Sequence, residues 1–154
     1  MTVYYANEQA QRADVPPRLP GNEGVGGRSR WYRATIPLDA PKTSSTTNGS
    51  GVTTSDPVVL FTRPPGMRFA RGFITSSVSL GTSTISIGVS GNPAKFKAAA
   101  TFTAVDTPTA FGVATLMAAA AKAASEDVIL TVATANLPTT AGAVLIIDME
   151  FIGP

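Results

Sequence analysis

The sequence predicts an all-β protein, an antiparallel β-sandwich of jelly-roll type with an extended N-terminal arm. From residue 28 onward the chain contains roughly seven or eight short apolar segments, and several alternate apolar and polar residues as half-buried strands do. Turn-forming residues separate these segments at intervals of about 8–12 residues, a spacing typical of sandwiches. The 154 residues are enough for one domain with its own core.

Two regions are predicted, an arm over residues 1–27 and a sandwich over residues 28–154. The first 27 residues contain Pro16, Pro17 and Pro20, several glycines and few large apolar side chains. Such a segment does not offset the entropy of ordering its own backbone, about 1–2 kcal/mol per residue. We therefore expect the arm to lie on its own domain or on a neighbouring subunit.

The first predicted strand covers residues 28–38, where Tyr32, Ala34, Ile36 and Leu38 share one face. Residues 40–56 are rich in Thr, Ser, Gly and Asn, and this composition predicts an exposed loop. Three more strands are predicted before the middle of the chain, over residues 57–62, 67–77 and 83–89.

A turn is predicted at Gly91-Asn92-Pro93, and the segment after it is ambiguous. Residues 116–124 favour a helix by propensity, whereas threonines between 101 and 109 favour extended structure. We expect extended segments with at most one short helix, and leave open whether Ala114–Ala124 is helix or strand. The last two strands are predicted over residues 127–133 and 143–152.

The predicted core consists of apolar residues on these strands. They are Ile36, Val59, Phe61, Phe73, Ile85, Ile87, Phe102, Phe111, Ile129, Val132, Leu145 and Ile147.

The composition excludes several kinds of chemistry. The sequence has no Cys and no His, so disulfides, thiol nucleophiles, zinc sites with nitrogen or sulfur ligands, and triads that need His are ruled out. Asp148 and Glu150 share one face of the last predicted strand, but no further oxygen ligand lies nearby in sequence. We therefore predict no catalytic residue, no metal site and no cofactor.

Charge is distributed unevenly along the chain. Residues 1–77 hold eight arginines and Lys42 against five acidic residues, whereas residues 78–154 hold three lysines against five acidic residues. The net charge of +2 is too small for a typical nucleic-acid binder, and we expect no nucleic-acid partner. Ala110–Ala121 is too short to span a bilayer and no signal peptide is visible, so we expect no membrane partner and synthesis in a cytoplasm.

Arg28, Arg30 and Arg33 surround Trp31 and Tyr32 in the first predicted strand. This basic and aromatic cluster is compatible with a protein contact, with a plain structural role, or with stacking on single-stranded nucleic acid. We favour the protein contact. The residues predicted to bind a partner, on this strand and in the arm, are Tyr4, Tyr5, Arg12, Val15, Arg18, Leu19, Arg28, Arg30 and Trp31.

The order of strands and turns resembles that of the small jelly-roll decoration (cement) proteins of tailed-bacteriophage heads. The resemblance covers roughly residues 27–152, and the alanine-rich stretch Ala118–Ala124 departs from it. Its residues are Gly27–Arg30, Pro65–Phe69, Gly72–Thr75, Ser79–Gly88, Lys95–Lys97, Ala100–Thr103, Asp106–Gly112 and Glu126–Val132.

The resemblance implies a virion structural protein that decorates and stabilises the capsid by binding the major capsid protein. It also implies a homo-oligomer (dimer or trimer) on the capsid surface, synthesised in the host cytoplasm, with no catalytic residues. The alternatives are a tail or neck adaptor, a head-fibre component, and a glycan-binding module in which Trp31, Tyr32 and Tyr5 would line a sugar site. An enzyme with converging carboxylates is the remaining alternative.

Overall fold

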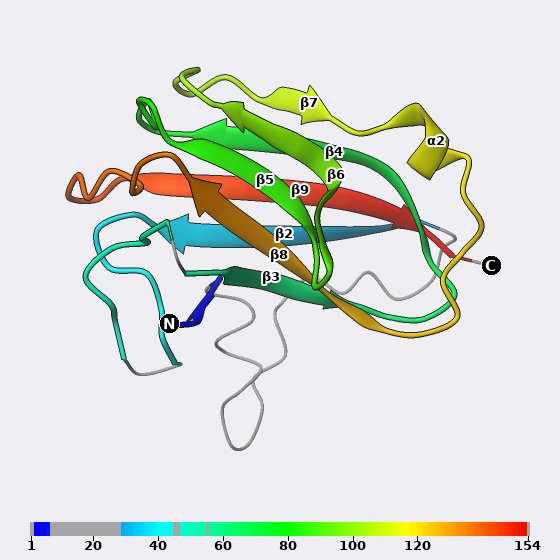
Figure 1. Ribbon diagram of the computed structural model, residues 1–154. Helices are drawn as coiled ribbons and strands as arrows, with labels where there is room; N and C mark the ends of the chain where they lie inside the picture. Colours follow the sequence, from blue (N-terminus) through cyan, green and yellow to red (C-terminus); the bar gives the residue numbers. More distant parts are fainter. Residues whose placement is uncertain (1, 7–28, 45–46, 55, 154) are drawn as a thin grey trace.

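The strands form two sheets packed face to face (Figure 1), in a computed structural model that describes residues 2–6, 29–44, 47–54 and 56–153. The elements are β1 (Tyr4–Tyr5), β2 (Ser29–Pro37), β3 (Val58–Arg63), β4 (Arg68–Ser76), β5 (Thr84–Val89), β6 (Asn92–Thr101), β7 (Thr109–Phe111), α2 (Ala114–Met117), β8 (Glu126–Ala133) and β9 (Val144–Ile152). One sheet has the strand order β2-β9-β4-β7, and the other has the order β1-β3-β8-β5-β6.

The strands from β2 to β9 have the arrangement of a jelly roll. They are divided equally between the two sheets, and consecutive strands change sheet at every connection except the β5–β6 hairpin. Every pairing among them is antiparallel. Two four-stranded sheets connected in this way are a double-sheet jelly roll, so the predicted fold class is confirmed.

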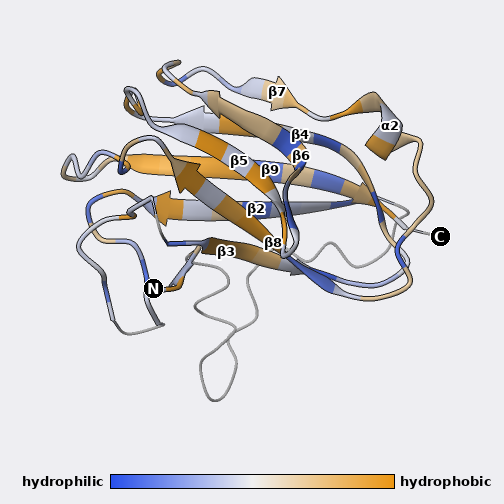
Figure 2. Ribbon diagram, viewed as in Figure 1, coloured by the Kyte–Doolittle hydropathy of each residue, from blue (hydrophilic) through white to orange (hydrophobic). Residues whose placement is uncertain are grey.

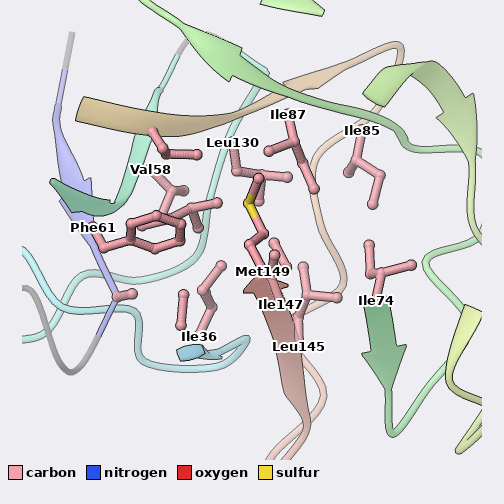
Figure 3. Packing of buried hydrophobic residues seen from close by; sticks show 14 of the residues in the cluster. Ile36, Val58, Phe61, Ile74, Ile85, Ile87, Leu130, Leu145, Ile147 and Met149 are labelled. Carbon is pink, nitrogen blue, oxygen red and sulfur yellow. The ribbon is translucent and has the colours of Figure 1, made fainter. Parts of the chain in front are cut away.

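The core fills the space between the sheets, and strand alternation determines which residues enter it. Ala34, Ile36 and Leu38 are fully buried, as the period of two in the first predicted strand indicates, and Tyr32 packs against the core. Figure 2 shows the hydrophobic stretches along β8 and β9. In Figure 3, Ile36 and Ile147 from one sheet lie across from Val58 and Leu130 of the other.

Most of the predicted core residues are buried. Four are only partly buried, and for three of these the reason is the face of the strand on which they lie. Val59 and Ile129 are cross-strand partners whose chain neighbours Val58, Leu60, Val128 and Leu130 occupy the inward positions. Phe73 likewise precedes the inward Ile74, and Phe111 packs against the rim of the core. The buried ones are Ile36, Phe61, Ile85, Ile87, Phe102, Val132, Leu145 and Ile147.

The start of the chain lies on its own body, which is one of the two places expected for the arm. Strand β1 pairs in parallel with β3, and Tyr4 is 5% exposed. The Tyr4 N–H donates to the Pro57 carbonyl at 3.0 Å, and the Ala6 N–H donates to the Val59 carbonyl at 2.9 Å. The rest of the predicted arm, residues 7–27, lies outside the described residues.

The loop before β3 is packed more closely than its polar composition predicts. Val52 and Asp56 are buried, and the Val52 carbonyl accepts a hydrogen bond from the Leu137 N–H at 3.0 Å. Asp56 accepts hydrogen bonds from the Thr2 N–H at 2.9 Å and the Thr53 hydroxyl at 2.6 Å. The Thr53 hydrogen bond is the main reason that the pKa of Asp56 is lowered despite its burial.

One of two local predictions in the middle of the chain is adjusted. The predicted turn at residues 91–93 is shorter, because Asn92 already begins strand β6. The ambiguous segment contains most of β6, then β7 and a single helical turn, α2, as the expectation of extended segments with at most one short helix has it. Helix α2 has no side-chain N-cap and no fully buried residue, so little favours its extension through the alanines that follow.

The alternation in β9 predicts different costs for two adjacent isoleucines. Ile147 is fully buried whereas Ile146 lies on the outer face and is partly exposed. Ile147→Ala should lower the free energy of unfolding by about 2–5 kcal/mol through the lost burial and the cavity. Ile146→Ala should cost under about 1.5 kcal/mol, measured by urea denaturation. Equal costs would contradict the register of β9.

Candidate functional site

The outer face of the β2-β9-β4-β7 sheet carries the most distinctive cluster of exposed side chains in the described part of the chain. Trp31 on β2 is 44% exposed, and its neighbour Tyr32 points into the sandwich. Trp31 and Arg33 lie on the same face because they are two residues apart on one strand. We call this set the outer-face cluster, and its members are Trp31, Arg33, Arg71, Phe73, Asp148 and Glu150.

The pairing register places the cluster in two rows across three strands. In one row Glu150 of β9 lies between Trp31 of β2 and Arg71 of β4. In the adjacent row Asp148 of β9 lies between Arg33 and Phe73. Each row therefore contains an arginine, an aromatic residue and a central carboxylate.

Aromatic and cationic groups contact one another across the rows. The rings of Trp31 and Phe73 are stacked with centroids 6.2 Å apart and an interplanar angle of 21°. The Arg71 guanidinium carbon lies 5.3 Å from the Trp31 ring centroid, within the range of a cation–π contact. These contacts hold Trp31 in place while leaving much of its ring accessible to a partner.

The arginines lie above the carboxylates that they pair with. Arg33 makes a bidentate pair with Asp148, with Nε to Oδ1 at 2.7 Å and Nη2 to Oδ2 at 2.9 Å. Arg71 Nε donates to Glu150 Oε2 at 2.6 Å. The arginine side chains are 64% and 57% exposed, whereas those of Asp148 and Glu150 are 22% and 13% exposed. The cluster thus presents guanidinium groups and aromatic rings outward.

Glu150 is held in its charged form by its neighbours. The Ser29 hydroxyl donates a hydrogen bond to it, and this contact is the main reason that the pKa of Glu150 is lowered. Burial opposes the shift, and the hydrogen bond and charge of Arg71 add to it. The carboxylate therefore stays ionised below the ordinary pKa range of a glutamate.

The predicted partner-binding residues do not gather at one place. Trp31 is on the outer-face cluster, and Arg30 is exposed near the start of β2. Tyr4 packs in the chain's own core and Tyr5 beside it is partly buried, and binding of a partner by either stays a prediction. Five further residues lie outside the described part of the chain: Arg12, Val15, Arg18, Leu19 and Arg28.

The aromatic set of the glycan-binding alternative is not brought together. Trp31 faces outward from one sheet, Tyr32 packs between the sheets, and Tyr5 lies on β1 of the other sheet. These three side chains therefore do not line one surface. The sequence pattern missed Phe73 and Arg71, whose proximity to Trp31 depends on pairing through β9.

The described residues contain neither a membrane-spanning helix nor a cluster of metal ligands. No helix there has both the length and the apolar character that crossing a bilayer requires. In the same part of the chain, no three acidic side chains are grouped closely enough to hold a metal ion.

Acid should weaken the fold partly through Glu150. Because folding lowers its pKa, Glu150 stabilises the fold above its unfolded pKa of about 4.3, and this contribution is lost as the pH falls through the lower folded pKa. The gap in urea midpoint between wild type and Glu150→Gln should therefore be largest near pH 7 and should shrink as the pH falls toward 3. Asp106→Asn, at an exposed loop carboxylate, is the control. A constant gap for Glu150→Gln would contradict the prediction.

Comparison with known proteins gives fold-level matches. No protein-family model matches the sequence, and no curated protein matches it. A chain of the structure described as "Capsid of Ralstonia phage GP4" has a TM-score of 0.66 at 15% identity, over 99% of this chain and 98% of that chain.

Two further solved structures share the fold. A chain of "Cyanophage Pam1 capsid asymmetric unit" has a TM-score of 0.61 at 17% identity, over 92% of this chain and 96% of that one. A chain of "Acidic stable capsid structure of Helicobacter pylori bacteriophage KHP30" has a TM-score of 0.53 at 14% identity, over 84% and 91%. At these identities the matches establish that this chain shares a fold with chains of three phage capsids.

Proposed function

We propose that this chain is a structural protein of a bacteriophage virion, which decorates and stabilises the capsid by binding the major capsid protein. The observation that carries the proposal is the extent of the fold match. The chain from the Ralstonia phage capsid is covered over 98% of its length, and 99% of this chain takes part. The likeness therefore concerns the whole unit and not a recurring substructure.

The outer-face cluster is the surface that we assign to the capsid contact. Aromatic and arginine side chains are enriched where protein interfaces gain most of their affinity. Burying a large apolar side chain contributes roughly 1.5–3 kcal/mol, whereas an exposed ion pair contributes about 0–1 kcal/mol. Trp31 and Phe73 should therefore contribute most of the affinity, and the arginines should orient the partner.

The proposed role requires many copies per particle and no catalysis. We propose a homo-oligomer (dimer or trimer) on the capsid surface, synthesised in the host cytoplasm, with no enzymatic activity. Contacts that exist only in the assembled shell would stabilise that shell by mass action. The crossing of residues 7–27 to a neighbouring subunit remains a prediction from the sequence.

Copy number separates decoration from the adaptor alternative. The purified chain is added to heads from which it has been removed, and bound copies are counted by quantitative gel and located by electron microscopy. Decoration predicts hundreds of copies in a regular array, together with a higher temperature of head disruption. Binding at one vertex in a few copies would instead identify a tail or neck adaptor, and absence of binding would contradict the proposal.

Trp31→Ala should weaken binding to stripped heads by at least about 10-fold, because it removes the largest exposed apolar side chain of the cluster. Arg71→Gln should weaken it by up to about fivefold, with less effect at high salt. Val105→Ala is the matched control, since Val105 is 46% exposed but lies between β6 and β7. Circular dichroism checks that each variant is folded. Unchanged affinity of Trp31→Ala would show that another surface meets the shell.

A further inference from the structure

A small pocket, partly open to solvent, lies at the end of the sandwich where β3 leads into β4, beneath the loop that follows α2. Its walls include three phenylalanines, Phe69, Phe96 and Phe151, which belong to the aromatic part of the core. Its charged lining consists of Arg63, Arg68, Lys95, Lys122 and Glu126. Four cationic residues and one carboxylate therefore line the pocket, in a chain whose overall charge is only +2.

Arg63 is the most deeply buried charge in the described part of the chain, at 2% exposure. Its guanidinium donates to the Met67 carbonyl, to the Ala124 carbonyl at 3.2 Å, and to Glu126 Oε1 at 3.3 Å from Nε. These hydrogen bonds connect β3 with the β3–β4 turn and with the start of β8. Arg63 is thus fixed in position and cannot move into solvent without breaking all of them.

Lys95 contacts the same carboxylate oxygen as Arg63. Its ammonium donates to Glu126 Oε1, its side chain is 14% exposed, and it lies 5.2 Å from the Phe96 ring centroid. Burial alone would raise the pKa of Glu126, but the Lys95 hydrogen bond and the charges of Lys95, Arg63 and Lys122 outweigh it and lower the pKa. One negative charge is therefore shared by two cations with little access to water.

The remaining two cationic residues of the lining, Arg68 and Lys122, are exposed. The backbone of Lys122 is held because its carbonyl accepts a hydrogen bond from the Gly66 N–H at 2.8 Å. An excess of buried positive charge beside aromatic walls is unfavourable unless an anion approaches it. The pocket lies next to that excess charge, and two more cationic residues belong to its lining.

We propose that this pocket binds an oxyanion, with Lys95, Lys122 and Arg68 as its ligands and Arg63 as the fixed charge behind them. Carboxylate and phosphate groups both have the required chemistry, since guanidinium and ammonium donors bind each of them. The oxyanion would come either from a free small ion or from an acidic side chain of a bound protein. The proposal does not depend on the role of the chain in a capsid.

Thermal unfolding of the full chain in inorganic phosphate, against sodium chloride at equal ionic strength, tests the proposal. Once phosphate exceeds its Kd roughly tenfold, Tm should rise by about 3 °C or more. Lys122→Gln changes an exposed side chain and should abolish most of the rise in Tm. Lys42→Gln is the control and should keep the rise, because the Lys42 ammonium donates to Asn48 at the other end of β3. Equal rises in wild type, Lys122→Gln and Lys42→Gln would reflect general salt exclusion and overturn the proposal.

The phosphate affinity of Glu126→Gln separates anion binding by the pocket from a purely structural role of its charged residues. This substitution removes the negative charge already present, so the variant should bind phosphate about tenfold more tightly even if it is less stable without phosphate. A short oligoglutamate peptide distinguishes the two sources. Peptide binding that phosphate displaces would assign the pocket to an acidic protein segment, and binding of phosphate alone would assign it to a free ion. No response to either probe in wild type or Glu126→Gln would overturn the proposal.

Discussion

Strand β9 pairs with β2 along one side and with β4 along the other, and the four-stranded sheet depends on this double pairing. Its side chains alternate without interruption between a buried apolar set and an outer set that includes two carboxylates. A shift of one residue would place Asp148 and Glu150 in the core, so the register is strongly specified. The core and the outer-face cluster are therefore positioned by the same strand.

The sequence was most informative where one strand carries its own pattern. Alternation in residues 28–38 identified a strand and its buried face, and the apolar run from 143 to 152 identified β9. Residues 83–89 also form a strand, but both of its faces are largely buried, whereas its alternation predicts one buried face. Phe73 shows the limit of this reasoning. It was assigned to the core because it is apolar and lies on a strand. Neighbouring residues of a strand face opposite sides, however, and Ile74 is the fully buried residue of this pair, so Phe73 faces outward.

Features that join distant segments were not visible in the sequence. Arg71 and Trp31 are 40 positions apart, and they meet only because β9 lies between their strands. Lys95 and Glu126 likewise come from β6 and β8, which lie on either side of β5. The sequence did not predict the two-residue strand β1, because Tyr4 and Tyr5 precede a segment whose composition favours no core contact.

The parallel pairing of β1 with β3 also affects how separate molecules behave toward one another. Without β1, the outer N–H and C=O groups of β3 would form the edge of the larger sheet, and a bare edge can accept a strand from another molecule. Two residues of β1 and the hydrogen bond from the Ala6 N–H occupy that edge near its beginning. The first residues of the chain thus cover part of the β3 edge, which leaves fewer backbone groups there for a strand of another molecule to pair with.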